Sequence, residues 1–380
     1  MKTHEKVREP LFHIIKRDGL VWWKSWLIRI ASVAAALLFS GVISYAITGE
    51  NPIDIYLTMI DGAVGSTHRV WNLLQAMAML LCVSLAVTPA FKMRFWNIGA
   101  EGQALIGGFA AAACMLKLTG VIPDVLMIPV MLLLSIVAGA IWGVIPAFFK
   151  ANWGTNETLF TLMMNYIAMQ IVSYFVSIWA VPKGSGQIGM INGSSNIGWL
   201  PRLFGQKYLV SILVVLLLTV LVYIYLKYSK HGYEISVVGE SENTARYIGI
   251  NVKKVIIRTM LISGALCGVA GFLLVAGSDH SITSDTIGGR GFTAIMVSWL
   301  AKFNPLTMIL TSFILVFMQK GAGEVATDLG LNHAFSDIIT GIIIFFIIGS
   351  EFFIHYQIKF REKEKASIDK DDKAEKEVKA

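Results

Sequence analysis

The chain has 380 residues, of which 55% are hydrophobic and 15% charged, and its mean hydropathy is +0.65. Soluble domains average about a quarter charged residues, so this composition excludes an ordinary soluble enzyme or binding domain. The formal charge of +7 does not by itself indicate a nucleic-acid partner, because membrane topology also concentrates positive charge.

Apolar segments recur along the chain, each close to the roughly 20 residues that a helix needs to cross a bilayer. The alternating segments of about ten residues that mark a membrane β-barrel are absent. The sequence therefore predicts an all-α, polytopic membrane protein with about ten transmembrane helices. We expect them near residues 27–48, 69–90, 97–116, 124–149, 158–181, 208–226, 255–276, 288–301, 306–320 and 335–354.

The distribution of basic residues predicts the orientation. If the N-terminus is inside, most of the 32 Lys and Arg residues fall in cytoplasmic segments, as the positive-inside rule requires. We therefore expect a multi-pass protein of the bacterial plasma membrane with both termini in the cytoplasm. A basic lead-in at 1–26 precedes the transmembrane domain at 27–354, and a charged, solvated tail follows at 355–380.

The eighth apolar segment, near 288–301, is short and starts among glycines. A broken or re-entrant helix is one interpretation. A crossing helix is favoured, because otherwise the basic tail would lie outside the cell.

Several kinds of site are not expected. The sequence has no GxxxxGK[ST] phosphate-binding loop and no HExxH motif, so neither ATP binding by a P-loop nor a metal or cofactor site is predicted. Cys82, Cys114 and Cys267 lie in apolar segments without CxxC spacing and are interpreted as small buried hydrophobes. We expect no catalytic residues, and we expect the energy for any transport to come from another subunit.

The loop 277–291 collects Asp279, His280, Asp285 and Arg290. A metal site would require closer convergence of these ligands. A solvated loop is the favoured interpretation, and a docking surface for an extracellular partner is the alternative.

Polar side chains inside the apolar segments are costly and therefore informative. Two interpretations remain open for them: substrate contact, or hydrogen bonds and close packing between helices, which small residues favour in lipid. The candidate substrate-pathway residues are Asn72, Gln75, Asn97, Glu101, Gln103 and Asn165.

The charged segment 231–254 lies between two apolar segments. Ser241 is a suitable N-cap, and Gly249 suits the left-handed position that ends a helix. A helix of about two turns is marginal alone in water, so we expect it to dock on a partner rather than to act as a plain connection.

Three motifs resemble a known family. WNIGAEGQALIGG (96–108), NETLFTLMMNYIA (156–168) and VVGESENTARYIGI (237–250) resemble, in family order, motifs of ATP-binding-cassette (ABC) permeases of the simple-sugar, nucleoside and branched-chain amino-acid importer type. The resemblance covers most of residues 55–350, and the longer permease subunit of nucleoside importers is the most similar type. Ser241, Glu242 and Thr244 depart from the family's usual coupling-loop residues.

The resemblance implies a mechanism and partners. It implies alternating access driven by a separate ABC ATPase with two nucleotide-binding domains, a second permease subunit, and an extracellular substrate-binding lipoprotein. Ribose-like sugars or branched-chain amino acids are alternative substrates, and an ATP-independent secondary carrier is a more distant alternative. The residues it implies for ATPase coupling are Gly239, Glu240, Ser241, Ala245, Arg246, Tyr247, Ile248 and Gly249.

Overall fold

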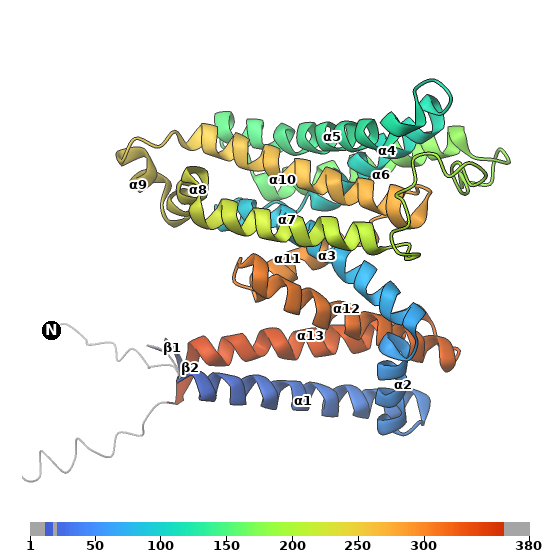
Figure 1. Cartoon of the computed structure of the whole chain (residues 1–380). Coiled ribbons are helices and arrows are strands. Elements are labelled where there is room, and N and C mark those ends of the chain that lie inside the picture. The colour runs from blue at the N-terminus through green and yellow to red at the C-terminus, as the bar shows by residue number, and fades with distance from the viewer. Residues whose placement is uncertain (1–11, 18–20, 361–380) are drawn as a thin grey trace, which may run out of the picture. The chain divides into compact units, whose positions relative to one another are not determined.

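The computed structural model describes residues 12–17 and 21–360, which are predominantly helical (Figure 1). The elements are β1 (Phe12–Lys16), α1 (Trp22–Thr48), α2 (Pro52–Val64), α3 (Thr67–Lys92), α4 (Ala100–Leu118), α5 (Asp124–Trp153), α6 (Glu157–Trp179), α7 (Leu209–Tyr228), α8 (Lys230–Glu240), α9 (Glu242–Tyr247), α10 (Val252–Leu274), the π-helical turn η1 (Val275–Asp279), α11 (Arg290–Leu300), α12 (Pro305–Asp328), α13 (His333–His355) and β2 (Tyr356–Phe360).

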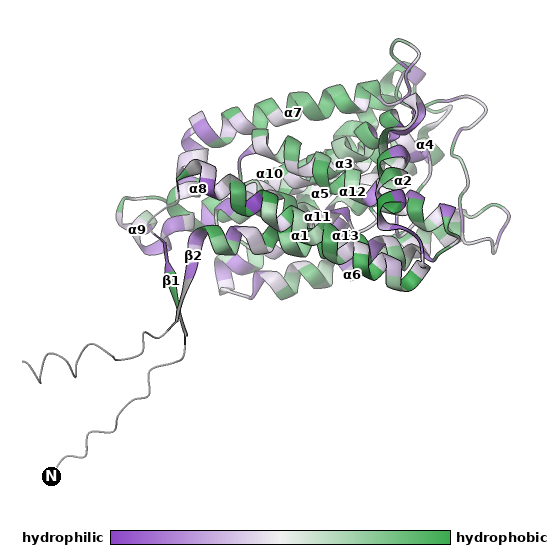
Figure 2. Cartoon of the chain, turned by 90° about the horizontal axis from the view of Figure 1, so that it is seen from below, coloured by the Kyte–Doolittle hydropathy of each residue, from purple (hydrophilic) through white to green (hydrophobic). Residues whose placement is uncertain are grey.

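The predicted helical membrane fold is confirmed, although the expected number of crossings is not reproduced. Within residues 12–17 and 21–360, eight helices are long and apolar enough to cross a bilayer. The two other expected spans correspond to α4, whose first turn is polar, and to α11, whose 11 residues are too few to cross as a straight helix. Helix α2 was not predicted. Figure 2 shows the hydrophobic character of the long helices.

Polar side chains define where several helices begin. Ser66, Asn156, Asn251 and Asn304 each accept a hydrogen bond from a backbone N–H in the first turn of the helix that follows. These bonds satisfy backbone N–H groups of the first turn, which have no partner inside the helix. Leaving such a group without a hydrogen bond near lipid costs free energy. The helix starts are therefore encoded locally, one residue before each apolar segment.

The chain divides into two compact units, residues 1–55 with 337–380, and residues 56–336. In the larger unit, α10 packs against α4 and α5 at backbone distance. A Cβ atom added to Gly268 would lie 2.1 Å from the Ser135 carbonyl oxygen on α5. One added to Gly271 would lie 2.0 Å from the Ala104 carbonyl oxygen on α4. At these two positions only glycine permits the approach. Small residues commonly allow helices to pack closely in lipid.

The smaller unit joins both ends of the described chain. Helices α1 and α13 lie side by side (Figure 1), and Arg29 Nη2 forms an ion pair with Glu351 Oε1 at 2.6 Å. Strands β1 and β2 pair antiparallel, with His13 opposite Lys359. The first residues of the expected solvated tail are thus in a two-stranded ribbon. This pairing was not predicted, because the partner strand lies about 340 positions away and leaves no local signal in the sequence. The rest of the tail lies outside the described residues.

Candidate functional site

A buried polar cluster surrounds the start of α4. Asn97 and Gln103 are 0% and 1% exposed. The Asn97 Nδ2 group donates to Gln103 Oε1 at 3.2 Å and to Ser263 Oγ on α10 at 3.2 Å, while Gln103 Nε2 donates to Asn97 Oδ1 at 3.1 Å. Asn97 Oδ1 also accepts from the Gly99 N–H. The two amides therefore satisfy each other and fix the turn that precedes α4.

Asn165 links α6 to this turn. Its Oδ1 accepts from the Gly102 N–H at 2.8 Å, and its Nδ2 donates to the Ile98 carbonyl at 2.9 Å. Thr161, one turn earlier on α6, accepts from the Ile98 N–H at 3.2 Å. Both ends of the Asn165 amide thus bind α4 and the turn before it. This agrees with the interpretation of the polar residues as hydrogen-bonding groups between helices.

Glu101 joins α4 to the segment before α11. Its Oε1 accepts from the Gly289 N–H at 2.8 Å, and its Oε2 accepts from the Gly291 N–H at 2.6 Å. The carboxylate is 3% exposed and lies at the N-terminal end of α11, where the helix dipole favours a negative charge. The sequence identified Glu101 as a candidate but gave no sign of this partner.

Asn72 and Gln75 lie one turn apart on α3 and are half-buried. Within the described residues, no hydrogen bond joins them to the cluster around α4. The structure thus brings together four of the six candidate pathway residues. It adds Thr161 and Ser263, ordinary hydroxyl residues that sequence inspection had no reason to single out.

The candidate coupling segment consists of α8 and α9, at one end of α7 and α10 (Figure 1). Helix α8 buries Ile235, Val238 and Gly239 on one face. Ser241 caps α9 by accepting from the Thr244 N–H, and Gly249 has φ +85°, both as predicted. Helix α9 has six residues, close to the expected two turns, and Ile248 departs from helical geometry.

Part of the surface of α9 is exposed. Ala245 is fully buried, whereas Tyr247 is 96% exposed and Ile248 is 55% exposed. Arg246 is exposed too, and it pairs with Glu242 at 3.3 Å on the same helix. The short helix therefore presents Arg246 and Tyr247 outward, and Ile248, the residue after it, is exposed beside them.

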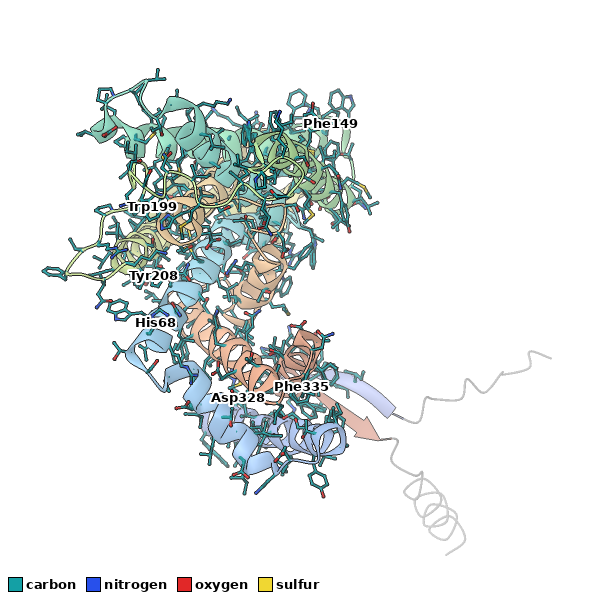
Figure 3. All side chains as sticks on the ribbon, turned by 90° about the vertical axis from the view of Figure 1, so that its right-hand side faces the viewer. His68, Phe149, Trp199, Tyr208, Asp328 and Phe335 are labelled. Atoms are coloured by element: carbon teal, nitrogen blue, oxygen red, sulfur yellow. The ribbon has the colours of Figure 1, made fainter. Side chains whose placement is uncertain are left out.

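The segment between α6 and α7 is anchored to the turn that follows α10. Trp199 and Tyr208, labelled in Figure 3, belong to this segment. The Trp199 ring stacks on His280 at 3.7 Å between centroids, and Lys207 Nζ donates to the Ser278 carbonyl at 2.9 Å. His280 is 2% exposed, so the expectation of a solvated loop is wrong at this residue. No group of three or more metal-ligating side chains occurs in the described parts of the chain.

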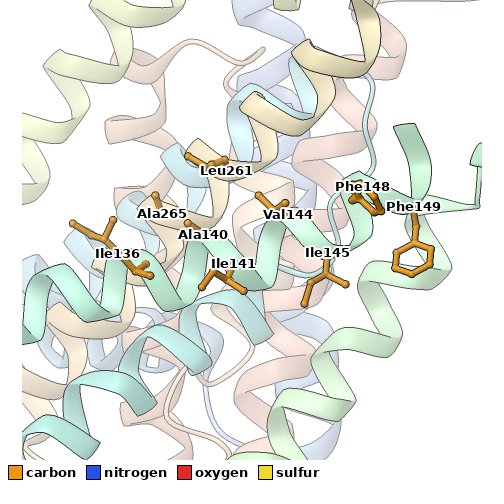
Figure 4. A pocket seen from close by; sticks show the side chains of 10 residues that line it. Ile136, Ala140, Ile141, Val144, Ile145, Phe148, Phe149, Leu261 and Ala265 are labelled. Atoms are coloured by element: carbon orange, nitrogen blue, oxygen red, sulfur yellow. The ribbon is translucent and has the colours of Figure 1, made fainter. Parts of the chain in front are cut away.

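Helix α5 carries an entirely apolar groove of about 630 Å³ (Figure 4). Its lining includes Ile141, Val144 and Phe148 on α5 and Leu261 on α10. Such a surface suits lipid chains or another apolar helix, and it offers no polar group to a substrate.

Residues 69–348 match the family described as "Branched-chain amino acid transport system / permease component". The match spans the helices that carry the polar cluster and the coupling segment. The chain belongs to this family. It is a multi-pass permease subunit of an ABC transporter, and its ATPase is a separate subunit.

Relatives of the permease are named for different substrates. It is 28% identical to the glucose ABC transporter permease protein TsgB13 of Haloferax volcanii, over 88% of this chain and 90% of that one. It is 29% identical to the guanosine ABC transporter permease protein NupP of Bacillus subtilis, over 85% and 92% of the two chains. It is also 29% identical to the nucleoside ABC transporter permease protein NupB of Lactococcus lactis, over 84% and 90%.

Proposed function

We propose that this permease imports nucleosides by alternating access. The observation that carries the proposal is the similarity to the guanosine and nucleoside permeases over more than four fifths of each chain. The glucose permease is similar to almost the same degree, which supports simple sugars as the second candidate. Branched-chain amino acids, the substrate in the family's description, are the third.

The proposed coupling element is α9 with its flanking residues. A helix of six residues is unstable alone in water, and here it is held by its Ser241 cap and by buried Ala245. The exposed side chains of Arg246, Tyr247 and Ile248 form a contact surface suited to a groove on the ATPase. Movement of the ATPase would then shift α9 and, through it, the start of α10.

The proposed assembly contains a second permease, an ATPase with two nucleotide-binding domains, and an extracellular substrate-binding lipoprotein. Both termini and the segment 231–254 lie in the cytoplasm in this proposal, as the distribution of Lys and Arg supports. The basic lead-in, the transmembrane domain and the charged tail keep the boundaries 1–26, 27–354 and 355–380.

The proposed substrate pathway runs beside α3 and the buried cluster. In this proposal, Asn72 and Gln75, which are half-buried on α3, face a water-filled cavity. In this proposal, Asn97, Glu101, Gln103 and Asn165 support the pathway from the start of α4, where their hydrogen bonds keep α4, α6 and α11 together.

Uptake into vesicles tests the proposal. The permease is reconstituted with its ATPase, second permease and binding lipoprotein, and radiolabelled guanosine, glucose and leucine are compared with and without ATP. We expect guanosine uptake that requires ATP. If glucose or leucine is taken up and guanosine is not, the substrate is a sugar or an amino acid instead of a nucleoside. Uptake without ATP by this chain in the absence of its partners would establish a secondary carrier.

A further inference from the structure

A polar pocket of about 440 Å³ lies between the start of α8 and the start of α10. Its lining includes three basic residues, Lys230 and Lys254 at the helix starts and Arg258 one turn further along α10. Glu234 is the one acidic residue among the lining side chains. The pocket borders the proposed coupling helix α9 but contains none of its residues.

The pocket carries an excess of positive charge. Arg258 Nη2 pairs with Glu234 Oε2 at 2.7 Å, and this pair uses the carboxylate. Lys230 and Lys254 are exposed, and among the described residues no carboxylate oxygen lies within ion-pair distance of either ammonium group. His231, on the pocket wall, adds no charge at neutral pH, because burial and the neighbouring Arg258 lower its pKa to about 4.

The position of the pocket relates it to the membrane. Helices α7 and α10 are both candidate spans, and α7 ends at Tyr228 while α10 begins at Val252. The pocket therefore lies where two apolar helices leave the hydrocarbon core and enter the headgroup layer. Ser229 and Asn251, the caps of α8 and α10, line it as well, so the positive ends of two helix dipoles lie beside it.

We propose that this pocket binds the phosphate group of an anionic phospholipid. The two unpaired lysines supply the charge, and basic pockets between membrane helices are suited to phosphate headgroups. A soluble phosphate would be recognised by the same groups, but the place of the pocket at the ends of two spans favours a lipid. A headgroup bound there bridges α8 and α10 on either side of the proposed coupling helix. The inference does not depend on which substrate the permease carries.

Native mass spectrometry of the permease with its ATPase tests the inference, using phosphatidylglycerol, phosphatidylcholine and inorganic phosphate as probes. Each lysine near a charged lipid contributes on the order of 1 kcal/mol, a factor of about five in affinity. We expect Lys254→Ala to weaken phosphatidylglycerol binding about fivefold and Lys230→Ala/Lys254→Ala to weaken it about 30-fold. The matched control is Lys253→Ala, which removes an exposed neighbouring charge outside the pocket and is expected to change affinity less than about twofold.

Any of four results would overturn the inference. Unchanged phosphatidylglycerol affinity in the double variant would show that the lipid does not bind in this pocket. Equal losses in Lys253→Ala and Lys254→Ala, or equally tight phosphatidylcholine binding, would show diffuse attraction to the headgroup layer. If inorganic phosphate alone binds with the expected lysine dependence and no lipid is retained, the ligand is a soluble phosphate.

Discussion

The Gly291 N–H donates a hydrogen bond of 2.6 Å to Glu101 Oε2, across 190 positions of sequence. A Cβ atom on Gly291 would lie 2.5 Å from the Glu101 backbone nitrogen, so the two segments meet at backbone distance. Helix α11 therefore begins where the Glu101 carboxylate holds it. This contact explains why the short helix α11 forms in the segment near 288–301, the shortest of the expected membrane segments.

The first prediction concerns this contact. Glu101→Leu leaves the buried N–H of Gly291 without an acceptor, at a cost of about 1–3 kcal/mol, and also removes the acceptor of the half-buried Gly289 N–H. We expect faster hydrogen exchange at residues 289–292 and a lower thermal midpoint, both followed on the purified complex. Glu50→Gln, which alters an exposed carboxylate outside the helices, is the control. Unchanged exchange at 289–292 would mean that α11 is held by other contacts.

The second prediction separates the pathway from packing among the polar residues. Asn165→Leu removes two hydrogen bonds between helices, and we expect the complex to lose about 1–3 kcal/mol of stability. Asn72→Leu and Gln75→Leu should leave the thermal midpoint within about 2 °C, since neither breaks a described hydrogen bond, yet reduce uptake several-fold. Normal uptake in both α3 variants would exclude them from the pathway.

The third prediction tests α9. The Arg246–Glu242 pair is exposed and contributes little, about 0.3–0.5 kcal/mol, so Arg246→Glu should not unfold the chain. A charge of the wrong sign at the proposed interface should instead weaken ATPase co-purification, since like charges there cost several kcal/mol. Gly249→Val strains a residue at φ +85° and should uncouple ATP hydrolysis from uptake while retaining part of the binding. Normal capture and uptake in both variants would make α9 a plain connection.

Much of this arrangement was predictable from local sequence. The helices begin at polar caps such as Ser241 and Asn156, and left-handed Gly249 ends the coupling segment, because these signals act within a few residues. The partners of Glu101 and the pairing of β1 with β2 were not predictable, since each joins segments that only tertiary packing brings together. Helix α2 was missed because its 13 residues are too few for a span.

The fourth prediction concerns orientation. Ser194 and Asn243 are exposed, and Cys82, Cys114 and Cys267 are buried, so engineered cysteines can be labelled against a low background. In cells, we expect an impermeant maleimide added outside to label Ser194→Cys but not Asn243→Cys. Permeabilised cells, in which both sites should react, are the control. Labelling of Asn243→Cys from outside would reverse the proposed topology.

The fifth prediction concerns pH. Burial, followed by the charge of Lys207, lowers the pKa of His280 from 6.5 to about 4. The folded protein thus binds fewer protons at this site than the unfolded chain between these values. Its contribution to stability is complete above pH 6.5 and is lost as the pH falls towards 4.

Thermal midpoints measured between pH 7.5 and 4.5 should therefore fall on acidification, and His280→Phe, which retains an aromatic ring beside Trp199, should reduce that slope. Comparing slopes removes the constant cost of placing Phe at φ +50°. An identical slope in both proteins would assign the acid sensitivity to other groups.

The glycine contacts of α10 restrict how this permease can move. Because α10 touches α4 at Gly271 and α5 at Gly268 with no side chain between them, none of the three can slide past another without backbone collision. We therefore expect α4, α5 and α10 to move as one rigid body. Helix α9 leads into α10 within a few residues, with the Ile250 N–H bonded to the Ala245 carbonyl at 2.9 Å. If α9 is the coupling helix, we expect force applied to it to turn a three-helix block rather than to bend a single helix.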